Sequence, residues 1–89
     1  MKTINITPKQ VGNFVISYLN SHEVAISFIG YHSSIATQLL THELVDDFLT
    51  PTGTFCNLPL NGLCYPGIIF KKPFFMSHKK LESLLKNTQ

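Results

Sequence analysis

The sequence has few charged residues and no arginine. Charged residues make up 13% of the 89 residues, and all seven basic side chains are lysines. The charged share is about half that of an average soluble protein. Proteins that read duplex DNA usually have a strongly basic face and use arginine at base edges. With a formal net charge of +2, the chain is not expected to bind duplex DNA.

A long hydrophobic run and a leader-like start are also lacking. The longest apolar run, Val24 to Ile29, is interrupted by Ser27 and is too short to span a bilayer. Asn5, Lys9 and Gln10 break up the beginning of the chain, where a secretory leader would be continuously apolar. We therefore expect no membrane association and a cytoplasmic protein.

Cysteine is scarce, and the chain has no linker, repeat or low-complexity segment. Cys56 and Cys64 are expected to be free thiols in a reducing compartment, and their spacing matches no zinc pattern. No metal and no cofactor are predicted. The length indicates one domain over residues 1–89. Because 44% of the residues are hydrophobic and few are charged, part of the apolar surface is expected to be buried in a homo-oligomer.

The charges that are present are divided unevenly. Residues 1–50 carry two lysines against four acidic residues, whereas residues 51–89 carry five lysines against one glutamate. The second part can attract a small anionic ligand. The alternative is an ordinary solvated lysine surface.

The first part of the chain predicts a strand followed by a helix. Residues 3–6 alternate polar and apolar side chains, as in a strand. Thr7-Pro8-Lys9-Gln10 has the residues of a helix start, namely a cap, a proline and a reciprocal glutamine. The apolar residues that follow have helical spacing: Val11, Phe14, Val15, Tyr18 and Leu19.

The remainder predicts two further helices and four strands. Residues 23–29 are typical of a central strand, and residues 33–48 predict a second helix that ends at Thr50-Pro51-Thr52-Gly53. Asn61-Gly62 indicates a hairpin within residues 55–65. Residues 67–71 predict a strand after a Pro66-Gly67 turn, and Ser77 caps a last helix. The predicted fold is α+β, a small mixed sheet with helices packed on it, in the order β-α-β-α-β-β-β-α.

The junction between the central strand and the second helix is the best candidate for a site. A strand that ends at Gly30 and enters a helix capped by Ser33 or Ser34 leaves backbone N–H groups available to a phosphate or carboxylate. Tyr31 can stack on a base, and His32 can transfer a proton near neutral pH. The alternative interpretation is an ordinary strand–turn–helix junction.

These residues resemble a known family. Ala25-Ile26-Ser27-Phe28-Ile29-Gly30 is followed by a histidine, hydroxyl residues and Leu39-Leu40-Thr41. This segment resembles the small viral ring-nuclease anti-CRISPR family, whose mark is Ile-Gly-His followed by Ser or Thr at a helix start. The resemblance covers about Ile6 to Thr41 and continues loosely through residues 67–71 and the helix after Met76.

The resemblance implies a counter-defence protein in the host cytoplasm. Family members are homodimers that bind cyclic tetra-adenylate across the subunit interface and cleave it without metal, with a histidine protonating the leaving 5′ oxygen. By this resemblance, His32 is the candidate general acid. Gly30, Tyr31, Ser33, Ser34 and Lys71 are the candidate ligand-binding residues.

The chain departs from the family at the catalytic position. Tyr31 follows Ile29-Gly30 where the family has histidine, and His32 comes one residue later. One residue rotates a helical side chain by about 100°, and loss of a general acid costs about 10²- to 10⁴-fold in rate. The expected function is therefore sequestration of a cyclic oligonucleotide, with cleavage left open. The alternative function is a protein-binding inhibitor of a host defence enzyme that has no small ligand.

The lysines and aromatic residues near the end of the chain complete the candidates. Lys71 and Lys72 lie at the end of the last predicted strand, and one of the two is expected to face an anionic ligand because strand neighbours alternate faces. Phe74-Phe75-Met76 is expected to lie in the core or in a dimer interface.

Overall fold

A computed structural model describes residues 2–29 and 49–87 of the chain. These residues form six strands and one helix. In chain order they are β1 (Lys2–Thr3), β2 (Lys9–Val11), β3 (Phe14–Asn20), β4 (Glu23–Phe28), β5 (Thr50–Leu60), β6 (Leu63–Lys71) and α3 (His78–Asn87).

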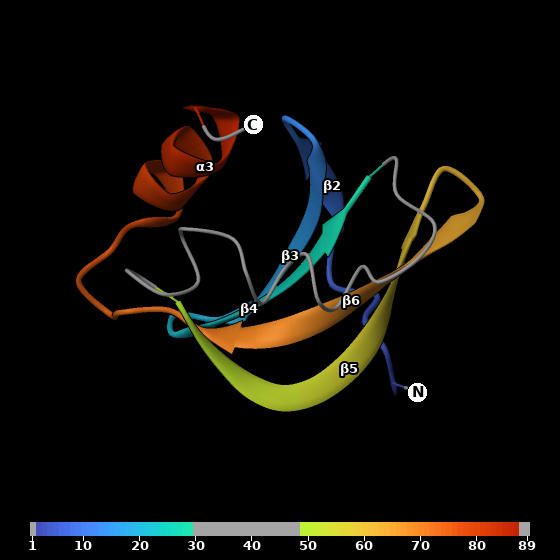
Figure 1. Cartoon of the computed structure of the whole chain (residues 1–89), viewed down its shortest axis with the longest axis horizontal. Helices are drawn as coiled ribbons and strands as arrows, with labels where there is room; N and C mark the ends of the chain where they lie inside the picture. Colours follow the sequence, from blue (N-terminus) through green and yellow to red (C-terminus); the bar gives the residue numbers. More distant parts are fainter. Residues whose placement is uncertain (1, 30–48, 88–89) are drawn as a thin grey trace.

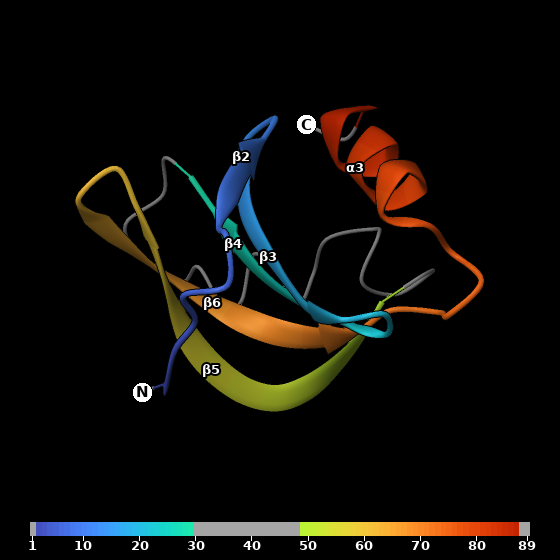
Figure 2. The same cartoon turned by 180° about the vertical axis from the view of Figure 1, so that it is seen from behind.

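The strands form a single bent sheet. Its spatial order is β1-β5-β6-β4-β3-β2. All neighbouring strands are antiparallel except β1, which pairs in parallel with Cys56 and Asn57 of β5. Figures 1 and 2 show the sheet bent into an arc, with β5 along its convex side and α3 beside the end of the β2–β3 hairpin.

The predicted α+β fold, with several helices packed on a sheet, is wrong. The described residues form a mostly antiparallel sheet with one short helix near the C-terminal end. Residues 7–19, predicted as a helix, instead contribute β2 and most of β3. Residues 33–48, predicted as a second helix, lie outside the described part of the chain.

A tight turn explains why residues 7–19 do not form a helix. Gly12 has a φ of +59°, and Gly12-Asn13 joins β2 to β3 in a hairpin in which Val11 pairs with Phe14. A glycine inside a helix costs about 1 kcal/mol relative to alanine, whereas this turn needs a left-handed residue. Val15 and Ile16 of β3 are β-branched and suit the sheet.

The strand and hairpin predictions after residue 22 are mostly confirmed. Residues 23–28 form β4, which lies inside the sheet between β6 and β3. Asn61 and Gly62 have φ values of 54° and 81°, as a two-residue hairpin turn requires, and they join β5 to β6. Pro66-Gly67 is not a turn, because β6 runs through both residues.

Both faces of the sheet carry buried apolar side chains. We call the face that packs against α3 the helix face. Its buried cluster consists of Val11, Phe14, Ile16, Val24, Ile26, Leu49, Ile68, Phe70 and Met76, together with Leu81 and Leu85 of α3. The opposite face has a second buried cluster of Ile4, Val15, Ala25, Cys56, Leu58 and Ile69. Apolar residues on both faces give β3 and β4 continuous hydrophobic runs instead of alternation.

The last predicted helix is confirmed. The Lys80 backbone N–H donates to Ser77 Oγ at 3.1 Å, which is the N-cap bond expected of serine. Leu81 and Leu85 are buried against the sheet, and Leu84 packs beside them. Within the described ranges, no helix has the length and apolar character needed to cross a membrane.

Candidate functional site

The structure describes one of the six binding and catalytic residues predicted from sequence. Gly30, Tyr31, His32, Ser33 and Ser34 lie outside the described residues. Ile29 immediately precedes them, and its backbone N–H donates to the Asn13 carbonyl oxygen at 2.8 Å. The geometry of the predicted strand-to-helix junction therefore stays a prediction.

Lys71, the predicted residue that is described, lies at the end of β6. It is exposed and pairs with Glu23, the first residue of β4. Ile29 lies beyond the other end of β4, about 20 Å away at about 3.3 Å per residue. Within one protomer, Ile29 and Lys71 therefore lie near opposite ends of β4.

The connection between β6 and α3 contains exposed aromatic side chains and a buried lysine. We call residues 72–77 the β6–α3 connection. Phe74 and Phe75 are 84% and 79% exposed, although phenylalanine is among the residues most often buried. Their rings form an edge-to-face pair with centroids 5.8 Å apart. Of the two predicted locations for this segment, the core is wrong for both rings, and a dimer interface stays a prediction for them. Met76 lies in the core, since it is 5% exposed.

The buried Lys72 side chain forms hydrogen bonds to the backbone of this connection. Its side chain is only 4% exposed, and its ammonium donates to the Met76 carbonyl oxygen at 2.5 Å and to the Pro73 carbonyl oxygen at 3.3 Å. Its backbone N–H donates to the His22 carbonyl oxygen at 2.8 Å. One buried lysine thus ties both ends of the Pro73–Met76 segment together.

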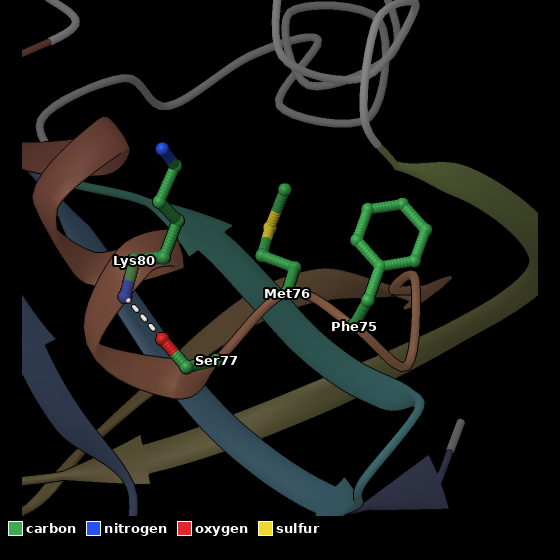
Figure 3. Close-up of a pocket in the computed structure, with 4 residues that line it drawn as sticks. All are labelled: Phe75, Met76, Ser77 and Lys80. Carbon is green, nitrogen blue, oxygen red and sulfur yellow. Dashed lines mark hydrogen bonds between the residues drawn. The ribbon is translucent and has the colours of Figure 1, made fainter.

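A hollow of about 420 Å³ opens beside the connection. The described residues that line it are Phe75, Met76, Ser77 and Lys80. Figure 3 shows the side chains of Phe75, Met76 and Lys80 pointing to the same side, with Ser77 below Lys80. The hollow thus combines an aromatic ring, a thioether, a hydroxyl and an ammonium at the start of a helix.

The electrostatics of this corner favour an anion. The N-terminal end of a helix has a partial positive charge, and Lys79 and Lys80 lie in the first turn of α3, exposed to solvent. The first turn contains no acidic residue. Buried Lys72 adds a third positive charge nearby.

A separate polar cluster fastens α3 to the sheet. The rings of Tyr18 and His78 stack with centroids 3.6 Å apart and planes 5° apart. The Tyr18 hydroxyl donates to Glu82 Oε2 at 2.8 Å and lies 3.2 Å from the His78 carbonyl oxygen. Lys9 Nζ forms an ion pair with the same Glu82 oxygen at 2.8 Å. The cluster therefore joins β2, β3 and α3.

These contacts shift the pKa of three groups. Burial, and then the Glu82 carboxylate, raises the pKa of Tyr18 above its ordinary value. Partial burial and the nearby Lys72 and Lys9 charges lower the pKa of His78, against the opposing effect of Glu82. Burial alone would raise the pKa of Glu82, but the bonds from Lys9 and Tyr18 outweigh it and lower that pKa.

The described residues contain no group of three or more His, Cys, Asp and Glu side chains arranged to hold a metal ion. Cys56 is buried and Cys64 is exposed, and the two cysteines do not form the disulfide whose absence the sequence predicts.

Comparison with protein families, with curated proteins and with solved structures finds no match to this chain. The resemblance to ring nucleases therefore depends on its residues alone. The capped helix at its beginning is wrong, because residues 9–20 form a hairpin, whereas its apolar strand is present as β4.

Sequence reasoning missed the β6–α3 connection as a site. The available signal was Lys71-Lys72-Pro73-Phe74-Phe75, in which two lysines and two aromatic residues surround a proline. Proline favours a chain reversal outside regular structure, where large apolar side chains can become exposed.

Proposed function

We propose that this protein binds a nucleotide ligand at the β6–α3 connection and sequesters it. The exposed Phe74–Phe75 pair beside a lysine-flanked hollow supports this proposal most strongly. Nucleotides have a planar base and an anionic phosphate, and binding proteins pair these with aromatic rings and basic side chains. In the hollow, Phe75 offers a ring face or edge, and Lys80 offers an ammonium.

The ligand class comes from the resemblance of about Ile6 to Thr41 to ring nucleases. It implies a cyclic oligonucleotide, specifically cyclic tetra-adenylate, and a counter-defence role in the host cytoplasm. Gly30, Tyr31, Ser33, Ser34 and Lys71 stay the sequence-based candidates for contacts to the same ligand class. Sequestration is the proposed outcome because Tyr31 occupies the position of the family's catalytic histidine.

A panel experiment tests the proposed function. Purified protein is incubated with cyclic di-, tri- and tetranucleotides, and bound ligands are identified by native mass spectrometry and by chromatography after heating. The expected result is one class of cyclic ligand, bound and recovered intact. Linear products that disappear in His32→Ala would instead assign cleavage to His32. The absence of bound nucleotide across the panel would overturn the proposal.

Paired variants locate the site. Phe75→Ala and Lys80→Gln are expected to weaken binding. Phe55→Ala and Lys86→Gln are matched controls, because Phe55 is 50% exposed on β5 and Lys86 lies in the last turn of α3. Ser34→Ala tests the sequence-based site. If Ser34→Ala abolishes binding while Phe75→Ala leaves it unchanged, the ligand occupies the strand-to-helix junction instead.

A second candidate function, a protein-binding inhibitor of a host enzyme, is favoured by the exposure of Phe74. Phe74 is 84% exposed and does not line the hollow, and exposed aromatic anchors often dominate binding energy at protein interfaces. A photo-crosslinking amino acid at position 74, with position 55 as the control, tests this function in host cells. Adducts to one host protein at position 74 only would support it, whereas equal labelling at both positions would contradict it.

A further inference from the structure

We propose that Lys72 selects the ligand, by fixing the Pro73–Met76 segment and by providing buried positive charge that favours a phosphate-bearing anion in the adjoining hollow. This inference rests on the proposed function for the location of the site. It goes beyond that function in naming a buried residue that does not line the hollow.

The Lys72 ammonium is a positive charge in the interior of the protein. Lys72 is 4% exposed, and its partners are two carbonyl oxygens, neither of which carries a formal charge. The one ion pair formed among the described residues is between Lys9 and Glu82. A buried ammonium is costly unless a counter-charge or several hydrogen bonds compensate it. Among residues 2–29 and 49–87, Lys72 has two such bonds for the three N–H donors of its ammonium, so the compensation from this part of the chain is partial.

The Lys72 ammonium lies next to the hollow. Met76 accepts a hydrogen bond from Lys72 through its carbonyl oxygen, and the same residue lines the hollow. The positive charge therefore lies behind the wall of the hollow, away from bulk solvent. In such surroundings an interaction between charges is weakened less by water and salt than it is at the surface.

The two lysines beside the hollow determine which ligand it prefers. Lys80 provides a flexible, exposed ammonium at the mouth of the hollow, and Lys72 provides a fixed one behind it. Lysine binds phosphate mainly as a point charge. Two positive charges on either side of an apolar lining suit a phosphate joined to an apolar or aromatic group.

The structural contribution of Lys72 is distinct from its charge. The Met76 backbone N–H donates to the Pro73 carbonyl oxygen at 3.0 Å, and the two bonds from the Lys72 ammonium add to this turn. Phe74 and Phe75 lie exposed between its ends. A shorter cationic side chain at position 72 would keep the positive charge but lose the two carbonyl bonds. Lys72→Met keeps most of the side-chain volume but loses both the positive charge and the carbonyl bonds.

Inorganic pyrophosphate, measured by titration calorimetry, is the test ligand because it isolates the anionic group. Lys72→Met keeps most of the volume and removes the ammonium, and Lys86→Met removes an exposed lysine of α3 as a matched control. Lys72→Met is expected to weaken pyrophosphate binding on the order of tenfold, because it removes one of the two positive charges beside the hollow. Lys86→Met is expected to bind as the wild type does. Equal affinity of Lys72→Met and wild type, or no pyrophosphate binding by the wild type, would overturn the inference.

The same proteins separate this inference from the proposed function. If cyclic oligonucleotides do not bind but pyrophosphate binds through Lys72, the inference holds and the nucleotide function fails. If cyclic oligonucleotides bind equally to wild type and Lys72→Met, the nucleotide function holds and the inference fails.

A spectroscopic measurement covers the case in which Lys72→Met does not fold. Wild-type protein labelled with ¹⁵N is titrated with pyrophosphate, and backbone amide shifts are followed. The largest shifts are expected at Met76, Ser77 and Lys80. Shifts confined to residues distant from the hollow, such as Lys86, would overturn the inference.

Discussion

At the scale of single residues, Gly67 shows how closely β4 and β6 approach. A Cβ atom built at Gly67 would lie well under 3.0 Å from the Ile26 carbonyl oxygen, which is backbone and cannot move aside easily. Beside it, Ser27 Oγ donates to the Pro66 carbonyl oxygen at 2.5 Å. Glycine is therefore required here for space.

We predict that Gly67→Ala destabilises the protein by about 1–3 kcal/mol, the usual cost of excess volume in a packed interior. Urea unfolding followed by circular dichroism measures the change. Thr54→Ala, at an exposed position of β5, is the control and is expected to unfold near the wild-type midpoint. An unchanged midpoint for Gly67→Ala would show that β4 and β6 are not packed as described.

Single residues also explain which turns the sequence reveals. Asn61-Gly62 is predictable because both residues readily adopt positive φ between apolar strands. Gly12-Asn13 makes the same kind of connection, but Val11, Phe14, Val15 and Tyr18 around it also have helical spacing, which misled the prediction. Pro66-Gly67 resembles a turn in sequence, whereas Gly67 in fact meets a need for space.

At the scale of elements, the contact of α3 with the β2–β3 hairpin depends on the Tyr18 hydroxyl. It donates to the Glu82 carboxylate at 2.8 Å, and a hydrogen bond to a charged group contributes about 1.5–3 kcal/mol net. We predict that Tyr18→Phe lowers the free energy of unfolding by about that amount and increases amide exchange in α3, measured by NMR. If the α3 amides exchange as slowly as in the wild type, this bond does not hold the helix.

The same contact predicts destabilisation by acid. Folding lowers the pKa of His78 from 6.5, so its contribution to stability is present above about pH 6.5 and is lost as the pH falls through the folded pKa. Glu82, lowered from 4.5, acts in the same direction below about pH 4.5. A protonated His78 also lies unfavourably at the positive end of α3.

Urea midpoints between pH 7.5 and 5 measure this dependence. His78→Asn is expected to lose part of the wild-type decrease, whereas His22→Asn, on the exposed β3–β4 turn, is expected to keep all of it. Identical pH profiles for wild type and His78→Asn would contradict the assignment to His78.

The burial pattern of each segment explains why the helix prediction failed for β3 and succeeded for α3. The sheet is apolar on both faces, so β3 has the continuous burial pattern of Phe14, Val15 and Ile16 instead of alternation. Such a run does not distinguish strand from helix by period alone. Residues 78–87 were predictable because Ser77 caps them and Leu81, Leu84 and Leu85 lie on one side.

At the scale of the whole molecule, the low charge content predicts self-association. Phe74 and Phe75 are the most exposed large apolar residues of the described chain, and apolar surface of this kind often marks an interface. We predict a homo-oligomer by light scattering after size exclusion, and a shift toward monomer in Phe74→Ser. A wild-type protein that stays monomeric at high concentration would contradict this prediction.

The candidate site could be predicted only in its composition. The sequence shows lysines and aromatic residues after residue 70, but it does not show which of them are buried. Only the fold shows that Lys72 and Met76 are buried, whereas Phe74 and Phe75 are exposed. These directions depend on a turn in which the Met76 backbone N–H donates to the Pro73 carbonyl oxygen and which the buried Lys72 ammonium supports from within.

The most direct test of the proposed site is the dissociation constant of cyclic tetra-adenylate for wild type and Phe75→Ala, measured side by side by titration calorimetry. Loss of one base–aromatic contact is expected to weaken binding at least about fivefold. Binding of wild type with a clearly weaker Phe75→Ala is the predicted result. Equal affinities, or no binding to the wild type, would contradict the account.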